Sequence, residues 1–320
     1  MVAIRERLPA LDRLAPAGEP APSDMFDWTT PIDRTRLYIC ETLSPLYYTA
    51  VYRDLGEEHR LRYNQLTGIL AVELIALLES EFLDAALAAV EAEEAPDSPL
   101  RAAVVRFARD ERRHAAAWAK LTRLSEPGWY AGRARHIVRL PPGAAGLLRF
   151  VARHPIAFPV VFWVQLAQEE RSIEISRRCM RMPADRIEPR YAGAFREHLV
   201  DETRHVQVDR HLIERFYAKR PAPVRRMTAR LFRAITRGFL LAPAHSTSQV
   251  IAILAREYPE LVPLLPRIRR ELRALEENDD YHRMMYSRRT TPVTFGLFDR
   301  FEEFRQMRHV LRSYRPERQS

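Results

Sequence analysis

The sequence contains few of the residues that cross-link a chain or let it bend sharply. It has only 2 cysteines and 10 glycines among 320 residues. Cys40 and Cys179 lie far apart and match no metal-binding or redox spacing, so we expect no structural disulfide and a reducing, cytoplasmic location. Ala, Leu, Arg and Glu dominate the interior stretches, and these residues favour helices because they lose little rotamer freedom there.

The sequence also lacks a long hydrophobic run. Its most apolar stretch, Ile156 to Ala167, contains Pro159 and Gln165 and is shorter than the roughly 20 residues that span a bilayer. The start, Met1 to Asp24, is charged and rich in Pro and Ala, without the apolar centre of a secretory signal. We therefore expect a buried helix at the apolar stretch and no membrane partner.

The charge balance is basic but not concentrated. The chain has 51 basic and 42 acidic side chains, a formal net charge of +9. Such a surface could steer an anionic substrate or an acidic carrier protein. The arginines are scattered along the expected helices without interleaved aromatics, and no nucleic-acid-binding module is recognisable, so nucleic acid is not an expected partner.

The pattern of apolar residues and prolines predicts one all-α protein. Residues 1–30 are expected to be a flexible arm, residues 31–220 a ferritin-like bundle, and residues 221–320 a helical covering layer. Two long helical hairpins inside the second region would form a four-helix bundle, with additional N- and C-terminal helices around it. The expected helices are 31–55 with a bend near Pro45, 57–94, 100–124, 155–180, 191–217, 223–240, 246–257, 260–277 and 296–313.

The second helix of each hairpin carries nearly the same pentapeptide. Asp-Glu-Arg-Arg-His occupies 110–114, and Asp-Glu-Thr-Arg-His occupies 201–205. Glu and His three residues apart share a helical face, so Glu111 with His114, and Glu202 with His205, could each reach one metal ion. Two such pairs on facing helices, with one more glutamate from each remaining helix, form the di-iron site of ferritin-like bundles.

The two further glutamates are chosen by height along the hairpins and by apolar neighbours. In the first hairpin Glu79 is favoured, Glu81 is the runner-up, and Glu73 lies too far back. In the second hairpin the candidates are Glu169, Glu170 and Glu174. Glu170 is favoured because Leu166, Ala167 and Ile173 surround it.

Other polar residues adjoin this face. His198 lies four residues before Glu202 and seven before His205, so it is a candidate ligand. Asp110 and Asp201 are candidates to hydrogen-bond the outer nitrogen of a ligating histidine across the bundle. Carboxylates with imidazoles and no thiolate suit iron or manganese, with Glu111 and Glu202 as candidate bridges between two metals. An apolar pocket is expected beside the metals, lined by Phe82, Phe107, Trp163 and Phe195.

At this point the chain resembles the AurF-like p-aminobenzoate N-oxygenases, di-iron enzymes that oxidise arylamines towards nitro compounds. The resemblance covers roughly residues 60–217 and includes Asn64-Gln65-Leu66 and a third histidine before the second Glu-x-x-His. It implies a homodimer, two iron ions and a peroxo-di-iron oxidant. The ligands it implies are Glu79, Glu111, His114, Glu170, His198, Glu202 and His205.

The leading hypothesis is therefore a di-iron oxygenase that uses dioxygen and an external electron donor to oxidise an amine in secondary metabolism. One alternative keeps the di-iron site but hydroxylates or desaturates a substrate tethered to an acidic carrier protein. Another is a non-enzymatic iron-binding protein, although storage cages are usually shorter and have acidic interiors. A metal-free scaffold would leave the repeated pentapeptide unexplained.

Overall fold

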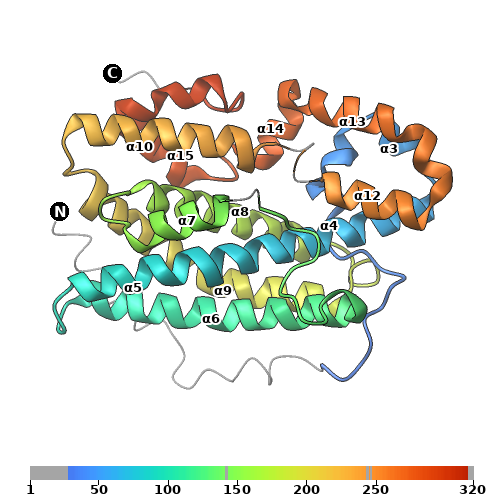
Figure 1. The fold of residues 1–320 in the computed structure, drawn as a ribbon, viewed down its shortest axis with the longest axis horizontal. Helices are drawn as coiled ribbons and strands as arrows, with labels where there is room; N and C mark the ends of the chain where they lie inside the picture. The colour runs from blue at the N-terminus through green and yellow to red at the C-terminus, as the bar shows by residue number, and fades with distance from the viewer. Residues whose placement is uncertain (1–27, 141–142, 243–244, 246, 316–320) are drawn as a thin grey trace.

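The computed structural model describes residues 28–140, 143–242, 245 and 247–315. This part of the chain is helical, and its one β-type pairing is an isolated parallel bridge between Leu37 and Ile187. Figure 1 shows the long helices side by side in the lower part of the molecule, with the C-terminal helices above them. The all-α prediction is confirmed, whereas most of the expected N-terminal arm lies outside the described residues.

The first hairpin contains the longest continuous helical run among the described residues. Helix α4 (Glu57–Leu77) continues through the π-helical turn η3 (Leu78–Leu83) into α5 (Asp84–Glu93). Helix α6 (Pro99–Ser125) returns beside it. The Ser98 hydroxyl accepts a hydrogen bond from the Arg101 N–H, and Pro99 suits the first helical position because that position needs no N–H donor.

The second hairpin completes the predicted bundle. Helix α8 (Val160–Met180) packs along α9 (Pro189–Leu212), which continues into the π-helical turn η5 (Ile213–Tyr217). The Glu188 carboxylate caps α9 by accepting the N–H groups of Arg190 and Tyr191. Helix α8 begins at Val160, later than predicted, because Pro159 inside a longer helix would remove an internal hydrogen bond.

The prediction of a long helix over residues 31–55 is wrong. The segment contains only η1 (Glu41–Leu43), η2 (Pro45–Tyr48) and α3 (Val51–Asp54). The Asn64 side chain on α4 accepts the N–H of Tyr38 and donates to the carbonyl of Ile39, which holds the segment extended. A Cβ atom added at Gly68 would lie 2.6 Å from Cβ of Tyr38, so the close approach requires glycine.

Two further helices were not predicted. The link between the hairpins contains α7 (Ala144–Arg153), which packs against α5 and η3, and the C-terminal layer contains α14 (Asp279–Met285). The expected helices of that layer are present in shorter pieces. They are α10 (Ala222–Ile235), η6 (Thr236–Leu240), α12 (Ser248–Glu257), η7 (Pro259–Leu264), α13 (Leu265–Ala274), η8 (Leu275–Glu277), α15 (Pro292–Arg300) and η9 (Glu302–His309).

The C-terminal layer covers the bundle on two sides. Helices α10 and α15 pack on α8, and α12 packs on α4. The ring of Trp163 on α8 stacks on Phe304, with centroids 3.8 Å apart, and both side chains are completely buried. The layer therefore shares an aromatic core with the bundle, and α8 is buried on its outer side as well as its inner side.

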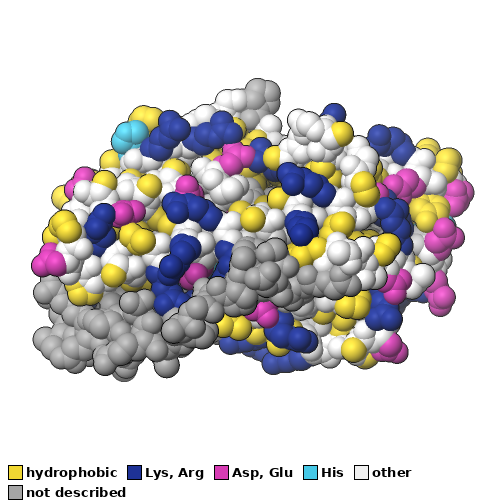
Figure 2. Space-filling model, turned by 90° about the horizontal axis from the view of Figure 1, so that it is seen from below, with side chains coloured by type: hydrophobic (Ala, Val, Ile, Leu, Met, Phe, Trp, Pro, Cys, Tyr) yellow, Lys and Arg dark blue, Asp and Glu magenta, His cyan; other side chains and the backbone are white. Residues whose placement is uncertain are grey.

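The surface agrees with the scattered charge of the sequence. On the face drawn in Figure 2, Lys and Arg side chains are interspersed with acidic and apolar ones rather than gathered into one tract. None of the helices within the described ranges combines the length and the hydropathy needed to cross a membrane.

Candidate metal centre

The two repeated pentapeptides face each other across the bundle. Glu111 and His114 project from α6, and Glu202 and His205 project from α9, all of them buried. The ring centroids of His114 and His205 are 5.9 Å apart. The two Glu-x-x-His pairs therefore meet in one interior site, as their helical spacing predicts.

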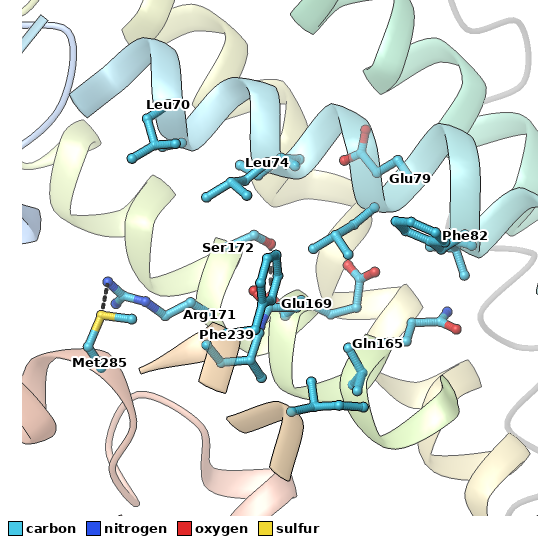
Figure 3. A pocket seen from close by; sticks show the side chains of 18 of the residues that line it. Leu70, Leu74, Glu79, Phe82, Gln165, Glu169, Arg171, Ser172, Phe239 and Met285 are labelled. Atoms are coloured by element: carbon cyan, nitrogen blue, oxygen red, sulfur yellow. Dashed lines mark hydrogen bonds between the residues drawn. The ribbon is translucent and has the colours of Figure 1, made fainter. Parts of the chain in front are cut away.

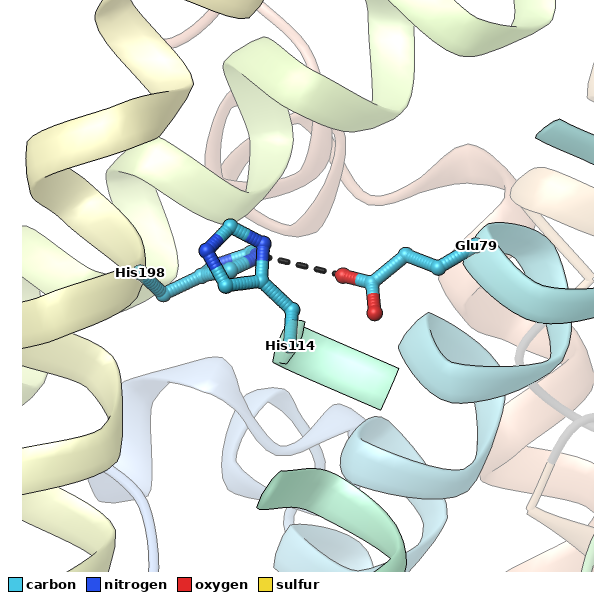
Figure 4. A group of neighbouring side chains, drawn as sticks. All are labelled: Glu79, His114 and His198. Atoms are coloured by element: carbon cyan, nitrogen blue, oxygen red, sulfur yellow. Dashed lines mark hydrogen bonds and ion pairs between the residues drawn. The ribbon is translucent and has the colours of Figure 1, made fainter. Parts of the chain in front are cut away.

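The buried acidic and imidazole groups form two adjoining sets. Glu79, His114 and His198 offer ligand atoms that lie within 4.8 Å of one another, as do Glu111, Glu169, Glu202 and His205. Figure 4 shows the first set converging from three different helices. Each set is compact enough to surround one metal ion, so the pair of sets has the form of a dinuclear centre.

Two carboxylates connect these sets. Glu111 Oε1 lies 3.4 Å from His114 Nδ1 and 3.1 Å from His205 Nδ1. Glu202 Oε1 lies 3.1 Å from His198 Nε2 and 3.3 Å from His205 Nδ1. Each carboxylate thus contacts a histidine of both sets, which is the position that a bridging ligand requires.

The π-helical turn η3 directs Glu79 into the site. Glu79 Oε1 accepts a hydrogen bond from Trp118 Nε1 at 3.3 Å and lies 3.1 Å from His198 Nε2. A π turn adds a residue to the helical repeat and often occurs at functional sites, because it changes which side chains face inward.

The alternatives to Glu79 have other roles. Glu81 is bound by Arg135 and by Arg149, whose Nη2 lies 2.5 Å away. Glu73 accepts hydrogen bonds from the Tyr130 hydroxyl and from backbone N–H groups of residues 136–138. Both carboxylates hold the link between the hairpins in place, away from the two sets.

The structure differs from the sequence-based choice in the second hairpin, where Glu169 and not Glu170 belongs to the site. Glu170 accepts the N–H groups of Val293 and Thr294, both at 2.7 Å, and so caps the start of α15. Its apolar neighbours belong to a core that includes side chains of the C-terminal layer, so they do not by themselves mark the bundle interior. Glu174 belongs to neither set, and its carboxylate forms an ion pair with Arg178 Nε at 2.7 Å.

A polar stripe on α8 marks the inward face that this reasoning missed. Gln165, Glu169 and Ser172 recur at intervals of four and three residues, so they share one face of the helix. The Ser172 hydroxyl donates to Glu202 Oε2 at 2.9 Å. The sequence therefore held a signal for Glu169, although apolar neighbours alone could not reveal it.

Asp110 and Asp201 support the histidines of the opposite helix. His114 Nε2 lies 3.1 Å from Asp201, and His205 Nε2 lies 3.5 Å from Asp110. Arg204 contacts both aspartates, with Nη2 3.2 Å from Asp110, and Arg113 also contacts Asp201. Such outer contacts fix the orientation of a ligating imidazole and leave its other nitrogen facing the site.

The electrostatics show a strongly acidic interior. Burial raises the pKa of Glu79 and Glu202 well above the usual carboxyl range, and the nearby Glu169 charge adds to both shifts. Burial also opposes ionisation of Glu111, but contacts with His114 and His205 outweigh it and lower the pKa to about 2. Ionising all of these carboxylates at close range costs free energy, so bound cations would stabilise the site.

The residues present fit a pair of metal ions. Several buried atoms that face the site have no hydrogen-bond partner within the described part of the chain, which is costly unless a ligand satisfies them. They are Glu79 Oε2, both carboxylate oxygens of Glu111, His114 Nδ1, Glu202 Oε1 and His205 Nδ1. All are oxygen or imidazole donors of the kind that iron and manganese accept.

One further acidic residue near the site is not among the predicted site residues. Asp209 lies one helical turn beyond His205, and it is completely buried with neither carboxylate oxygen hydrogen-bonded among the described residues. Burial raises its pKa well above the usual value, and the charge of Glu169 adds to the shift. The signal available in the sequence was its helical spacing from His205.

A cavity of about 510 Å³ adjoins the first set. Glu79, Glu169 and His198 are in its wall, which is otherwise mostly aliphatic (Figure 3). Of the four aromatic residues predicted to line a pocket, only Phe82 lines this cavity. Phe107 stacks on His205, Phe195 packs on Trp118, and Trp163 belongs to the outer aromatic core.

Together the helical bundle, the paired carboxylate and histidine sets and the adjoining apolar cavity define the class of ferritin-like dinuclear metal proteins. The model of the family described as P-aminobenzoate N-oxygenase AurF matches residues 6–262. The chain therefore belongs to the AurF family, a family of di-iron oxygenases. The search of curated proteins found no match for this chain.

Proposed function

We propose that this protein binds two iron ions and uses them with dioxygen to oxidise the nitrogen of an amine. The amine that we favour as substrate is an arylamine. The observation that carries the proposal is the meeting of two Glu-x-x-His pairs and a third histidine beside an apolar cavity, in a chain of the AurF family. When bound, the irons supply the activation of dioxygen, with electrons from an external donor.

The proposed ligands follow the two buried sets. Glu79, His114 and His198 would hold one iron, and Glu169 with His205 would hold the other. Glu111 and Glu202 would bridge them, because each contacts histidines of both sets. This set differs from the sequence-based one only in having Glu169 in place of Glu170.

The remaining residues would keep the ligands in place and the site dry. Trp118 and Ser172 donate hydrogen bonds to Glu79 and Glu202, which limits the rotation of these two carboxylates. The aliphatic wall of the cavity excludes water from the region where an organic substrate would meet the site. We also propose a homodimer and a cytoplasmic location, as the resemblance and the cysteine usage imply.

The experiment that tests the proposal measures iron per chain after anaerobic reconstitution. We expect two irons, followed by oxygen consumption and an optical change when air is admitted to the reduced protein. A parallel incubation with p-aminobenzoate as a trial arylamine, analysed by mass spectrometry, should show oxygen added to the amine nitrogen. Many irons per chain would indicate storage, and no bound iron would contradict the proposal.

The variant His198→Ala provides a sharper check of the site. We expect it to fold, since removal of an imidazole from a buried site still leaves the helix intact, but to bind iron more weakly and consume oxygen more slowly. Unchanged iron content and oxygen consumption in this variant would contradict the assignment of His198.

A further inference from the structure

The two cysteines of the chain lie against each other, although they are 139 positions apart in the sequence. Cys40 directly precedes η1, and Cys179 is in the last turn of α8. The backbone N–H of Cys40 donates to Sγ of Cys179 at 3.4 Å, and both residues are free thiols. Since the sequence has no other cysteine, this contact brings together every thiol of the chain.

The distance between the two residues suits a disulfide. Because N and Cα of a residue are about 1.5 Å apart, Sγ of Cys179 lies at most about 5 Å from Cα of Cys40. Disulfides usually join residues whose Cα atoms are about 4.4–6.8 Å apart, so side-chain rotation with small backbone shifts would allow the bond. The Cys40 thiol now contacts Oγ1 of Thr42 at 3.3 Å, a contact that it can leave at little cost because a thiol is a weak hydrogen-bonding group.

The two thiols differ in their access to solvent. Cys40 is partly exposed, whereas Cys179 is completely buried. Burial raises the pKa of Cys179 to about 12, although the N–H of Cys40 opposes the shift. Cys179 is therefore inert towards molecules in solution, and Cys40 is the thiol that a reagent reaches first. Arg178 lies beside it, with Nη1 3.1 Å from Oγ1 of Thr42, so an approaching anion meets a positive charge.

The contact between the cysteines connects two parts of the cavity wall. Ile39 and Leu43, on either side of Cys40 in the sequence, line the cavity, and so does Ile175, one turn before Cys179 on α8. The segment around Cys40 has only the short helical turns η1 and η2 of its own. A covalent link at this point would therefore fix one side of the cavity wall to α8.

We propose that Cys40 and Cys179 form a site of reversible thiol oxidation, with a small disulfide such as oxidised glutathione as the oxidant. The thiolate of Cys40 attacks one sulfur of the oxidant, and one glutathione leaves and takes up the proton. Cys179 then loses its proton, attacks the Cys40 sulfur of this mixed disulfide and displaces the second glutathione. Two protein thiols are oxidised to one disulfide, and the small disulfide is reduced to two thiols. The link fixes the cavity wall near Ile39, and a reductant reverses it.

The test incubates the full-length, iron-loaded protein with oxidised glutathione and measures its mass after the remaining thiols are blocked with N-ethylmaleimide in a mildly acidic denaturant. We expect the wild type to lose two hydrogens. Its tryptic peptides 37–53 and 179–181 should be joined by a bond that dithiothreitol breaks. The melting temperature of the oxidised protein should rise by roughly 5–10 °C, because the link closes a long loop of the chain.

Two single variants separate the steps of the reaction. In Cys179→Ala, Cys40 should keep the mass of one glutathione, because no second thiol displaces it. In Cys40→Ser, the buried Cys179 should stay unmodified. The melting temperature should rise in neither variant. Circular dichroism checks that both are folded, and Cys179→Ser replaces Cys179→Ala if the alanine variant is not.

The matched control moves one thiol and keeps their number at two. Cys40→Ser combined with Ala234→Cys places an exposed thiol on α10. Phe232 on the same helix has its ring centroid 6.2 Å from that of Trp163, and Trp163 lies roughly 24 Å from Cys179 along α8. This variant should take up glutathione at the exposed thiol without forming an internal disulfide.

The inference goes beyond the proposed function, and iron-free protein should give the same masses. It would be overturned if the wild type kept two free thiols or took up glutathione without linking peptides 37–53 and 179–181. An internal disulfide formed equally in the control variant would also overturn it. An internal disulfide without any rise in melting temperature would reject the fixing of the cavity wall.

Discussion

Glu169 and Glu170 are neighbours in the sequence, yet they have different surroundings. A step of one residue turns the side chain by about 100° around the helix axis. Glu169 therefore faces the buried metal-ligand set, whereas Glu170 reaches the backbone at the start of α15. Both carboxylates are buried, so burial by itself does not distinguish a ligand from a cap.

The first prediction separates these two roles by one matched substitution. Glu169→Gln should bind iron at least about tenfold more weakly than the wild type, because even outer-shell losses commonly reduce metal affinity by that factor. Glu170→Gln should retain two irons per chain. Metal analysis after reconstitution over a range of free iron concentrations measures both variants. Normal iron binding in Glu169→Gln together with loss in Glu170→Gln would restore the sequence-based choice.

Among the secondary-structure elements, helix ends and π-helical turns determine where the acidic side chains of α8 and η3 lie. The turn η3 brings Glu79 inward and leaves Glu81 to the arginines of the link. The start of α15 rests on Glu170, whose carboxylate accepts two N–H groups that the helix itself leaves without acceptors. This contact joins the C-terminal layer to α8.

The second prediction concerns the pH dependence of this helix cap. Burial raises the pKa of Glu170 to about 6, and the N–H groups of residues 293 and 294 oppose the shift only in part. The folded state therefore holds a proton more tightly than the unfolded state. The contribution of Glu170 to stability is complete below the unfolded pKa of about 4.5 and is lost as the pH rises through about 6.

Urea unfolding of the wild type and Glu170→Gln at pH values from well below to well above this interval measures the effect. The stability of the wild type relative to the variant should fall with rising pH by about 2 kcal/mol, which corresponds to the size of the pKa shift. Glu302→Gln, at an exposed position, controls for the amide substitution itself. A difference between wild type and Glu170→Gln that stays constant or grows with pH would contradict the prediction.

Across the described chain as one body, the bundle and the C-terminal layer share a core. Helix α8 contributes Glu169 to the buried carboxylate and histidine set on its inner side and Trp163 to the aromatic core on its outer side. Because the same helix makes both contacts, disruption of the C-terminal layer should also disturb the buried carboxylate and histidine sets. We therefore expect the described bundle and layer to unfold together.

The third prediction tests this shared core with Phe304→Ala. Phe304 is completely buried and stacks on Trp163, so its truncation should lower the free energy of unfolding by roughly 3–5 kcal/mol. Phe150→Ala, at a side chain that is 52% exposed, should change it by less than about 1 kcal/mol. Thermal and urea unfolding, followed by helical signal and by iron release, provide the measurements. A separate early transition of the layer with iron retained would contradict the shared core.

The helical class, the two hairpins and the repeated Glu-x-x-His pairs could all be predicted from the amino-acid sequence, because helical periodicity is a local property of the chain. The same periodicity pointed to Glu79 and His198, which the structure brings together in one buried set.

The choice between Glu169 and Glu170 needed the folded structure, because α8 is buried on both sides and apolar neighbours mark either side equally. The extended course of the chain near Tyr38 also depends on a distant contact. There the Asn64 side chain supplies hydrogen bonds to the backbone that outweigh the local preference for a helix. Local sequence patterns thus determined which residues could share a helical face, and packing between distant segments determined which of those faces meets the buried carboxylate and histidine sets.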